Sequence, residues 1–172
     1  GNSFDLEDMI GIGGTMPLLE THLWNDGIPY KAIDDITIAQ GTSLIVADGV
    51  TVKFPVNFSG ISVFGSMSAS NATFMSFIPP LEPGGDYWQA IFFWPGSSGL
   101  LENCRVEYGG SIVRQYHPDH QGDDSDPSYY LDALGNVVIS GNASVTLNNV
   151  TSKHSFTSGI YVSNGSPSMQ TV

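Results

Sequence analysis

The chain has few cysteines, few basic residues and no long apolar segment, and each shortage excludes a class of protein. Cys104 is the single cysteine among 172 residues, so no disulfide can close within the chain. Five Lys and Arg stand against 17 Asp and Glu, which gives a net charge of −12. This field repels phosphate groups, and we exclude nucleic acid as a partner. No apolar run reaches the ~18 residues of a membrane span, so we expect no transmembrane segment.

Asparagine, by contrast, is frequent in one particular context. Five Asn-x-Ser/Thr triplets occur, where chance predicts roughly two, and this favours a glycosylated, extracellular or cell-surface protein. The chain begins at Gly1 and carries no basic and apolar leader, so we expect a processed or clipped chain. The alternative is that Asn, Ser and Thr are simply common in β-turns. The expected acceptors are Asn57, Asn71, Asn142 and Asn164.

From Thr21 onward the sequence is typical of short strands separated by turns. Residues 50–54, Val-Thr-Val-Lys-Phe, alternate between apolar and polar side chains, and Asp48-Gly49 before them marks a turn. Cys104 lies in a similar alternation and is expected to be a small buried side chain, with a reactive or intermolecular thiol as the alternative. Such strands without a helical period predict an all-β fold, either a parallel β-helix or a β-sandwich.

An internal repeat favours the β-helix. Aligning Asn142 with Asn164 superposes four further pairs, Val138 with Ile160, Val145 with Pro167, Leu147 with Met169 and Val150 with Val172. A repeat of this kind buries its apolar face by stacking on a copy of itself. We therefore expect Leu147 and Met169 to point inward in successive coils, and Val138 and Ile160 to do the same.

A second alignment concerns a corner of the predicted coil. Leu101-Glu102-Asn103 matches Leu147-Asn148-Asn149, about two coils apart once an intervening loop is removed. Asn103 and Asn149 are then expected to stack through their side-chain amides. On this interpretation Asn149 faces inward and is a poor glycan acceptor.

Several blocks resemble right-handed parallel β-helix repeat proteins of microbial cell surfaces. They are residues 24–54, 87–93, 101–110 and 158–163, and the resemblance covers roughly residues 24–172. It implies a right-handed parallel β-helix of about five or six coils over residues 24–172, preceded by an irregular arm or cap at residues 1–23. This scaffold hosts lyases, hydrolases, adhesins and structural proteins, so the resemblance implies no single activity.

The main irregularity is an acidic loop inserted at residues 111–134. Four aspartates, Asp119, Asp123, Asp124 and Asp126, offer the hard oxygens that calcium prefers, and calcium is the one cofactor candidate. His117 and His120 could instead serve a transition metal, although their spacing alone is a weak signal. A solvated loop without a metal is the alternative.

No catalytic constellation is convincing, and we expect a protein that is not an enzyme. Asp34-Asp35 and Asp123-Asp124 supply carboxylate pairs of the polygalacturonase kind, but no basic substrate clamp accompanies them. A polysaccharide lyase or hydrolase is the alternative. The aromatic stretch 87–94 suggests a surface for sugars, with Trp88, Phe92 and Trp94 on one face of a strand. A glycan, the residues 78–85 or a neighbouring subunit would cover that face.

The two ends of the chain suggest self-assembly. The sequence stops in a strand pattern, and an open coil is a template for another chain. The first 20 residues do not show the coil repeat but carry apolar side chains, among them Phe4, Leu6, Met9, Ile10 and Ile12. We expect this segment, or the coil behind it, to dock head to tail on a second copy by β-strand addition. The alternative is that the protein continues past Val172 and that the segment folds back as an N-terminal cap. The predicted function is an exported structural or adhesive surface protein, with itself and surface glycans as partners. A monomeric glycan-binding module is the further alternative.

Overall fold

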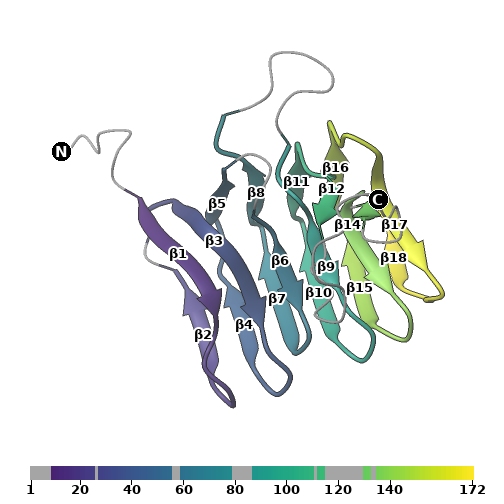
Figure 1. Cartoon of the computed structure of the whole chain (residues 1–172), viewed down its shortest axis with the longest axis horizontal. Helices are drawn as coiled ribbons and strands as arrows, with labels where there is room; N and C mark the ends of the chain where they lie inside the picture. The colour runs from purple at the N-terminus through teal and green to yellow at the C-terminus, as the bar shows by residue number, and fades with distance from the viewer. Residues whose placement is uncertain are drawn as a thin grey trace, which may run out of the picture.

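The structure, a computed structural model, describes residues 9–25, 27–55, 59–78, 87–110, 112–114, 130–132 and 135–172. The described residues contain β-strands and no helix. Short alternating segments closed by Gly, Asn or Pro turns account for this, since none offers the apolar period of a helix. The strands stack from the N-terminal to the C-terminal end of the molecule in chain order (Figure 1).

The strands form three parallel ladders, which we number 1 to 3. Ladders 1 and 2 share β1 (Ile10–Thr15) and the long β3 (Tyr30–Ile38), and together make a ten-stranded sheet. Ladder 1 continues through β5 (Thr51–Phe54), β8 (Thr73–Ser76), β11 (Arg105–Glu107) and β16 (Thr151–Lys153). Ladder 2 continues through β6 (Ile61–Val63), β9 (Ile91–Phe93), β14 (Gly135–Ser140) and β17 (Ser158–Ser163).

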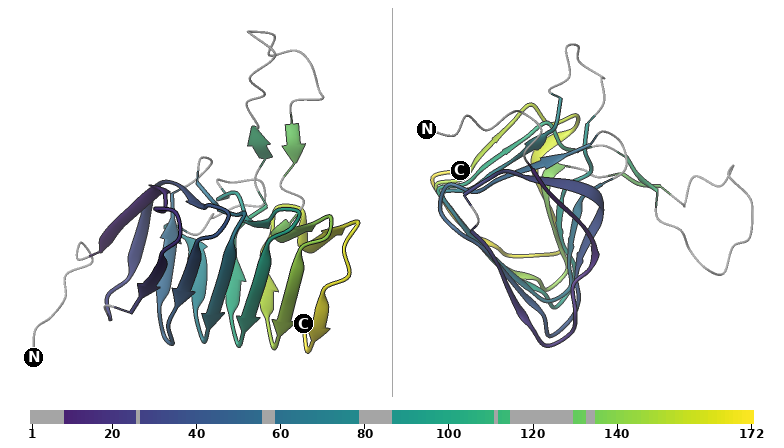
Figure 2. Two further views of the ribbon diagram at one scale, coloured as in Figure 1. Left: turned by 90° about the horizontal axis from the view of Figure 1, so that it is seen from below. Right: turned by 90° about the vertical axis from the view of Figure 1, so that its left-hand side faces the viewer.

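Ladder 3 is a separate six-stranded sheet. It contains β2 (Thr21–Trp24), β4 (Ser43–Val46), β7 (Ser66–Ser70), β10 (Ser98–Glu102), β15 (Ser144–Asn148) and β18 (Ser168–Gln170). The chain visits the three ladders in turn, and the layers superpose into a nearly closed outline (Figure 2). An all-β fold is confirmed, and the parallel pairing is compatible with the expected β-helix. The strands β12 (Ile112–Arg114) and β13 (Tyr130–Asp132) form a small antiparallel pair apart from the ladders.

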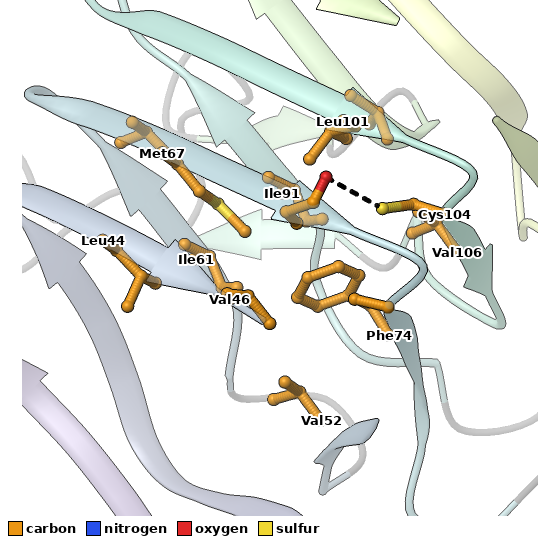
Figure 3. Close-up of a cluster of buried hydrophobic side chains, with 14 of the residues drawn as sticks. Leu44, Val46, Val52, Ile61, Met67, Phe74, Ile91, Leu101, Cys104 and Val106 are labelled. Atoms are coloured by element: carbon orange, nitrogen blue, oxygen red, sulfur yellow. Dashed lines mark hydrogen bonds between the residues drawn. The ribbon is translucent and has the colours of Figure 1, made fainter. Parts of the chain in front are cut away.

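The core lies inside this outline, where side chains of neighbouring layers stack in register. Val52, Phe74 and Val106 form one such column across β5, β8 and β11, and all three are buried (Figure 3). Parallel pairing places aligned residues on the same face, so one alternating strand pattern repeated in each layer builds a continuous apolar interior. Cys104 is buried in this core as a free thiol, as predicted, and burial raises its pKa.

The corner between ladders 3 and 1 confirms the predicted asparagine stack and corrects two details. Asn149 Nδ2 donates to Asn103 Oδ1 at 2.8 Å. The two residues occupy adjacent layers rather than layers two coils apart, since β10 pairs directly with β15. Asn149 is exposed, so its predicted inward orientation is wrong. Both residues have φ of 51°, a left-handed conformation that Asn tolerates and that turns the side chain out of the core.

The register of the C-terminal repeat is correct for one predicted pair and wrong for the other. Leu147 aligns with Met169, so this register is confirmed, although Met169 is 43% exposed in the last described layer. Ile160 aligns with Val137, whereas Val138 aligns with Tyr161 and faces outward. Ser140 aligns with Ser163 and Thr146 aligns with Ser168, so the chain takes six residues from ladder 2 to ladder 3 in one layer (146 − 140) and five in the next (168 − 163), and a constant offset fails in ladder 2. A slip of one residue reverses the face of a strand.

Within residues 1–23, which the sequence assigned to an arm or cap, β1 belongs to the ten-stranded sheet, and β2, which ends at Trp24, belongs to ladder 3. Ile10 and Ile12 align with Tyr30 and Ala32 in β3, and β2 aligns with β4 along its whole length. Both isoleucines pack against the core. This part of the segment is therefore continuous with the sheets. Phe4 and Leu6 lie outside the described residues, and Met9 is half-buried.

Candidate functional site

The outer face of ladder 2 carries apolar side chains that are separate from the main hydrophobic core. Alternation turns Ile91 and Phe93 of β9 inward and leaves Phe92 outside. Ala90 and Val138 form a small outer cluster, against which Phe92 and Tyr161 pack. Ala90 and Val138 are themselves buried, so the accessible apolar surface here comes from the half-buried rings of Phe92 and Tyr161. Accessible apolar rings gathered on one face make that face the first candidate for binding.

Aromatic rings from three layers gather at this face. We call Phe64, Phe92, Trp94 and Tyr161 the aromatic strip. The rings of Phe92 and Trp94 stack with centroids 4.2 Å apart, and those of Phe64 and Trp94 stack at 5.3 Å with planes 6° apart. Phe64 is 40% exposed, and the other three rings are half-buried. Mutual stacking fixes the ring orientations before any ligand arrives.

A shallow groove adjoins the strip where ladder 2 turns into ladder 3. It encloses about 300 Å³ and is lined by Thr37, Ala39, Gln40, Phe64, Pro95 and Gly96. The volume lies at the small end of ligand sites, which typically range from about 300 to 1,000 Å³. One aromatic ring and two polar side chains therefore line an open, sugar-sized depression.

The sequence placed Trp88 on the same face as Phe92 and Trp94, and this was wrong. Trp88 is fully buried, its ring stacks on Phe54 at 4.2 Å, and its Nε1 donates to the Glu107 backbone oxygen at 2.7 Å. The error arose because β9 begins at Ile91, so strand alternation does not extend back to residue 88. Phe64 and Tyr161 were missed, although the alternation of residues 61–64 would have turned Phe64 outward.

The aspartates predicted to bind calcium, Asp119, Asp123, Asp124 and Asp126, lie outside the described residues, as do His117 and His120. Among the residues that the structure does describe, no group of three or more potential metal ligands comes together. The connection that contains the acidic loop runs from ladder 1 to ladder 2, as do the segments 55–60 and 77–90. All three of these longer connections therefore depart from one corner of the stack.

Three of the four predicted glycan acceptors lie in described turns of other corners. Asn71, Asn142 and Asn164 are exposed, and Asn57 lies outside the described residues. The Asn71 side chain donates to Ser70 Oγ at 3.2 Å. Asn71 follows β7 as Asn103 follows β10, and it too has a positive φ, of 49°. Exposure is necessary for modification, so three predicted sites remain available to it.

The aspartate pair 34–35 is the one carboxylate pair that the structure describes. Asp35 Oδ1 accepts from the Gly60 backbone N–H at 3.1 Å. Burial raises the pKa of the Asp35 carboxyl, the Gly60 hydrogen bond lowers it, and the neighbouring charge of Asp34 raises it again, with a net upward shift. The hydrogen bond between Asp35 and Gly60 thus links two neighbouring layers at their corner.

Within the described residues no helix is present that could cross a membrane. Comparison with known proteins finds no matching family model, no similar curated protein and no similar solved structure. The assignment of a function therefore rests on the geometry of the chain itself.

Proposed function

We propose that the chain is a right-handed parallel β-helix that serves as an exported adhesive module of a cell surface and binds glycans through the aromatic strip. The observation that carries this proposal is the stack of Phe64, Trp94 and Phe92 beside the groove. A sugar ring has an apolar C–H face and a polar edge. The exposed face of Phe64 suits the first, and the side chains of Thr37 and Gln40 suit the second.

Tryptophan fluorescence offers a direct test. Trp24 and Trp88 are buried in the core, whereas Trp94 is half-buried in the strip, so a bound sugar should change the emission of Trp94. We expect neutral polysaccharides to shift the emission of the wild-type chain in a saturable way. Trp94→Phe should abolish the signal while retaining an aromatic ring.

A matched pair of variants distinguishes binding at the aromatic strip from non-specific adsorption of sugars to any exposed apolar side chain. Phe64→Ala removes a ring that is 40% exposed, and Leu100→Ala removes a side chain that is 41% exposed on the outer face of ladder 3. We expect Phe64→Ala to weaken binding at least tenfold and Leu100→Ala to leave it unchanged. Equal losses in both variants, or no binding by a folded wild-type chain across a broad panel, would refute the proposal.

End-to-end stacking of copies is a second candidate function, and one observation favours it. Ladder 3 runs from β2 to β18, and among the described residues no strand pairs with the outer edge of either. An unpaired edge accepts a strand from a second copy or from any further chain. Because Ile10 and Ile12 already pack on their own core, the contact would join whole end layers.

Ultracentrifugation of two lysine variants tests the stacking. Met169→Lys charges the last described layer, and Ile45→Lys charges β4, a strand of ladder 3 that is paired on both sides, at a similarly exposed position, 43% against 40%. We expect the wild type and Ile45→Lys to form linear assemblies and Met169→Lys to disperse them. A wild-type chain that stays monomeric at high concentration would exclude this candidate.

A further inference from the structure

The cations of this acidic chain are concentrated on ladder 1. Four of its five basic residues, Lys31, Lys53, Arg105 and Lys153, lie on strands of that ladder, and the fifth, Arg114, lies on β12. Lys31 aligns with Lys53, and Lys153 stands at the equivalent position three strands further along. Although the net charge of the chain is −12, basic residues therefore outnumber acidic ones on the strands of ladder 1.

One of these cations is neutralised within the fold. Arg105 Nε lies 2.7 Å from Oε1 of Glu107, a carboxylate that is 3% exposed. The hydrogen bond with this carboxylate raises the pKa of Arg105. The Glu107 carboxylate offsets the charge of Arg105, so Arg105 adds no net charge to this face. Three lysines remain.

Lys31 and Lys53 lie on adjacent strands, where their like charges repel one another. Their Nζ atoms lie 4.6 Å and 5.8 Å from the centroid of the same ring, that of Phe77. Like charges on directly opposed strand positions repel one another. Cation–π attraction to Phe77 offsets part of this repulsion. No carboxylate pairs with either lysine among the described residues, although the chain contains 17 acids.

We propose that Lys31, Lys53 and Phe77 form a binding site for the carboxylate or sulfate groups of an anionic polysaccharide. Neighbouring strands are ~4.8 Å apart, so one oxyanion can bridge the two ammonium groups with charge-assisted hydrogen bonds. Lys153 follows Lys53 after three strand spacings, ~14 Å along the same ladder, and meets a later charge of a linear polymer. Met75 and Glu107 occupy the two register positions between these lysines, and the Glu107 carboxylate there is neutralised by Arg105. This repeat favours a polyanion over a small free anion. The choice of a polysaccharide rests on the glycan-binding function proposed above.

Affinity electrophoresis of the whole chain provides the test. The probes are polygalacturonate, which carries carboxylates, dextran sulfate, which carries sulfates, and neutral dextran. The double variant Lys31→Gln with Lys53→Gln should bind the anionic probes at least tenfold more weakly, and Lys31→Arg with Lys53→Arg should restore binding. Binding should weaken with added salt, because exposed charges are screened.

A charge-matched control addresses the general effect of making the chain more acidic. Thr146→Glu with Ser168→Glu also lowers the net charge of −12 by two, at adjacent exposed positions of ladder 3. We expect this control to bind like the wild type. An equal loss in the control, or undiminished binding by a folded Lys→Gln double variant, would overturn the site.

Other outcomes separate this site from its alternatives. If the wild type binds no anionic probe but forms salt-sensitive oligomers that the Lys→Gln double variant disperses, the face binds an acidic surface of a second copy and the polysaccharide proposal is wrong. Failure of the glycan-binding function would instead appear as loss of the Phe64-dependent signal with neutral probes. The two proposals thus fail independently.

Discussion

Asn149 donates its side-chain amide to the side-chain oxygen of Asn103 in the adjacent layer, at 2.8 Å, and both backbones have φ of 51°. Each residue therefore has two roles. It adopts a left-handed turn that most side chains resist, and it links one layer to the next. The backbone continues the link, since the Asn103 N–H donates to the Asn148 oxygen at 2.9 Å.

The two roles can be separated by substitution at Asn103. Asn103→Gly keeps the turn and loses the amide bond, so it should lower the free energy of unfolding by about 0.5–1.5 kcal/mol. Asn103→Ala should cost roughly a further 1 kcal/mol, because Ala does not favour a positive φ. Urea unfolding measures both. If Ala and Gly cost the same, the conformational role of Asn103 is refuted.

Asn136 is the buried polar residue on which the corner between ladders 1 and 2 depends. Its Oδ1 accepts from the Gly109 N–H at 2.6 Å, and its Nδ2 lies 2.9 Å from the backbone oxygens of Val106 and Lys153. Asn136→Ala leaves the Gly109 N–H without its acceptor and takes one donor from the oxygens of Val106 and Lys153, although the Lys153 oxygen keeps the Tyr108 N–H at 3.3 Å. Each buried unsatisfied group costs about 1–3 kcal/mol. We expect a loss of roughly 3 kcal/mol or more in urea unfolding. A loss below about 1 kcal/mol would show that water replaces the amide.

The register of the C-terminal layers predicts unequal costs for two aligned residues. Leu147 is fully buried and Met169, its partner in β18, is 43% exposed. Leu147→Ala should cost about 2–5 kcal/mol as a large-to-small change in the core. Met169→Ala should cost far less in dilute monomeric chain. Equal costs would indicate that another layer covers Met169 in solution.

Sequence reasoning recovered the parts of the fold that repeat locally. The stacking of Leu101 on Leu147 and of Asn103 on Asn149 followed from matched triplets, because parallel layers place identical residues in register. The alignment of Val138 with Ile160 failed where one turn is a residue shorter. Turn length is set by backbone geometry at the corner and is not visible in a constant offset.

The candidate sites depend on contacts between distant residues, and this explains why sequence reasoning found Phe92 and Trp94 but missed the partners that complete each site. Phe64 and Trp94 are 30 positions apart, and Lys31 and Phe77 are 46 apart, yet each pair is in contact. Only the layer register brings them together. Trp88 shows the reverse error, since it follows an aromatic pattern but enters the core before β9 begins. Local alternation placed Phe64 and Trp94 correctly one residue after their strands, and it failed at Trp88, three residues before β9.

Calcium binding by the acidic loop predicts a stability that depends on the metal. A ligand of the native state stabilises it by mass action, so an excess of chelator should lower the melting temperature by several degrees. Readdition of calcium should restore it, and magnesium should not. Asp123→Asn with Asp124→Asn should remove the response. An unchanged melting curve in chelator would refute calcium binding at Asp119, Asp123, Asp124 and Asp126.

Asp35 predicts a pH dependence of stability at the corner of the second layer. Its carboxyl has a pKa above the usual value, chiefly because of burial, with the Gly60 hydrogen bond opposing the shift and the charge of Asp34 adding to it. The folded state therefore holds this proton to a higher pH than the unfolded state does. Between the ordinary aspartate pKa and the raised one, stability falls as the pH rises, and the deficit persists to neutral pH.

Asp35→Asn removes the ionisation and keeps an oxygen for the Gly60 N–H. We expect the variant to be more stable than the wild type at pH 7 by only a fraction of a kcal/mol, because the Asp35 carboxyl is only partly desolvated at this corner and stays accessible to water, which screens its charge. The difference should vanish below about pH 3, where both states of the wild type are protonated. Asp48→Asn, at an exposed turn on another corner, controls for the loss of one negative charge from an acidic chain. Either substitution would relieve general charge repulsion equally. In thermal melts across pH 3 to 7, a larger gain in stability for Asp35→Asn than for Asp48→Asn would assign the effect to the local environment of Asp35. Equal gains in stability would contradict this assignment.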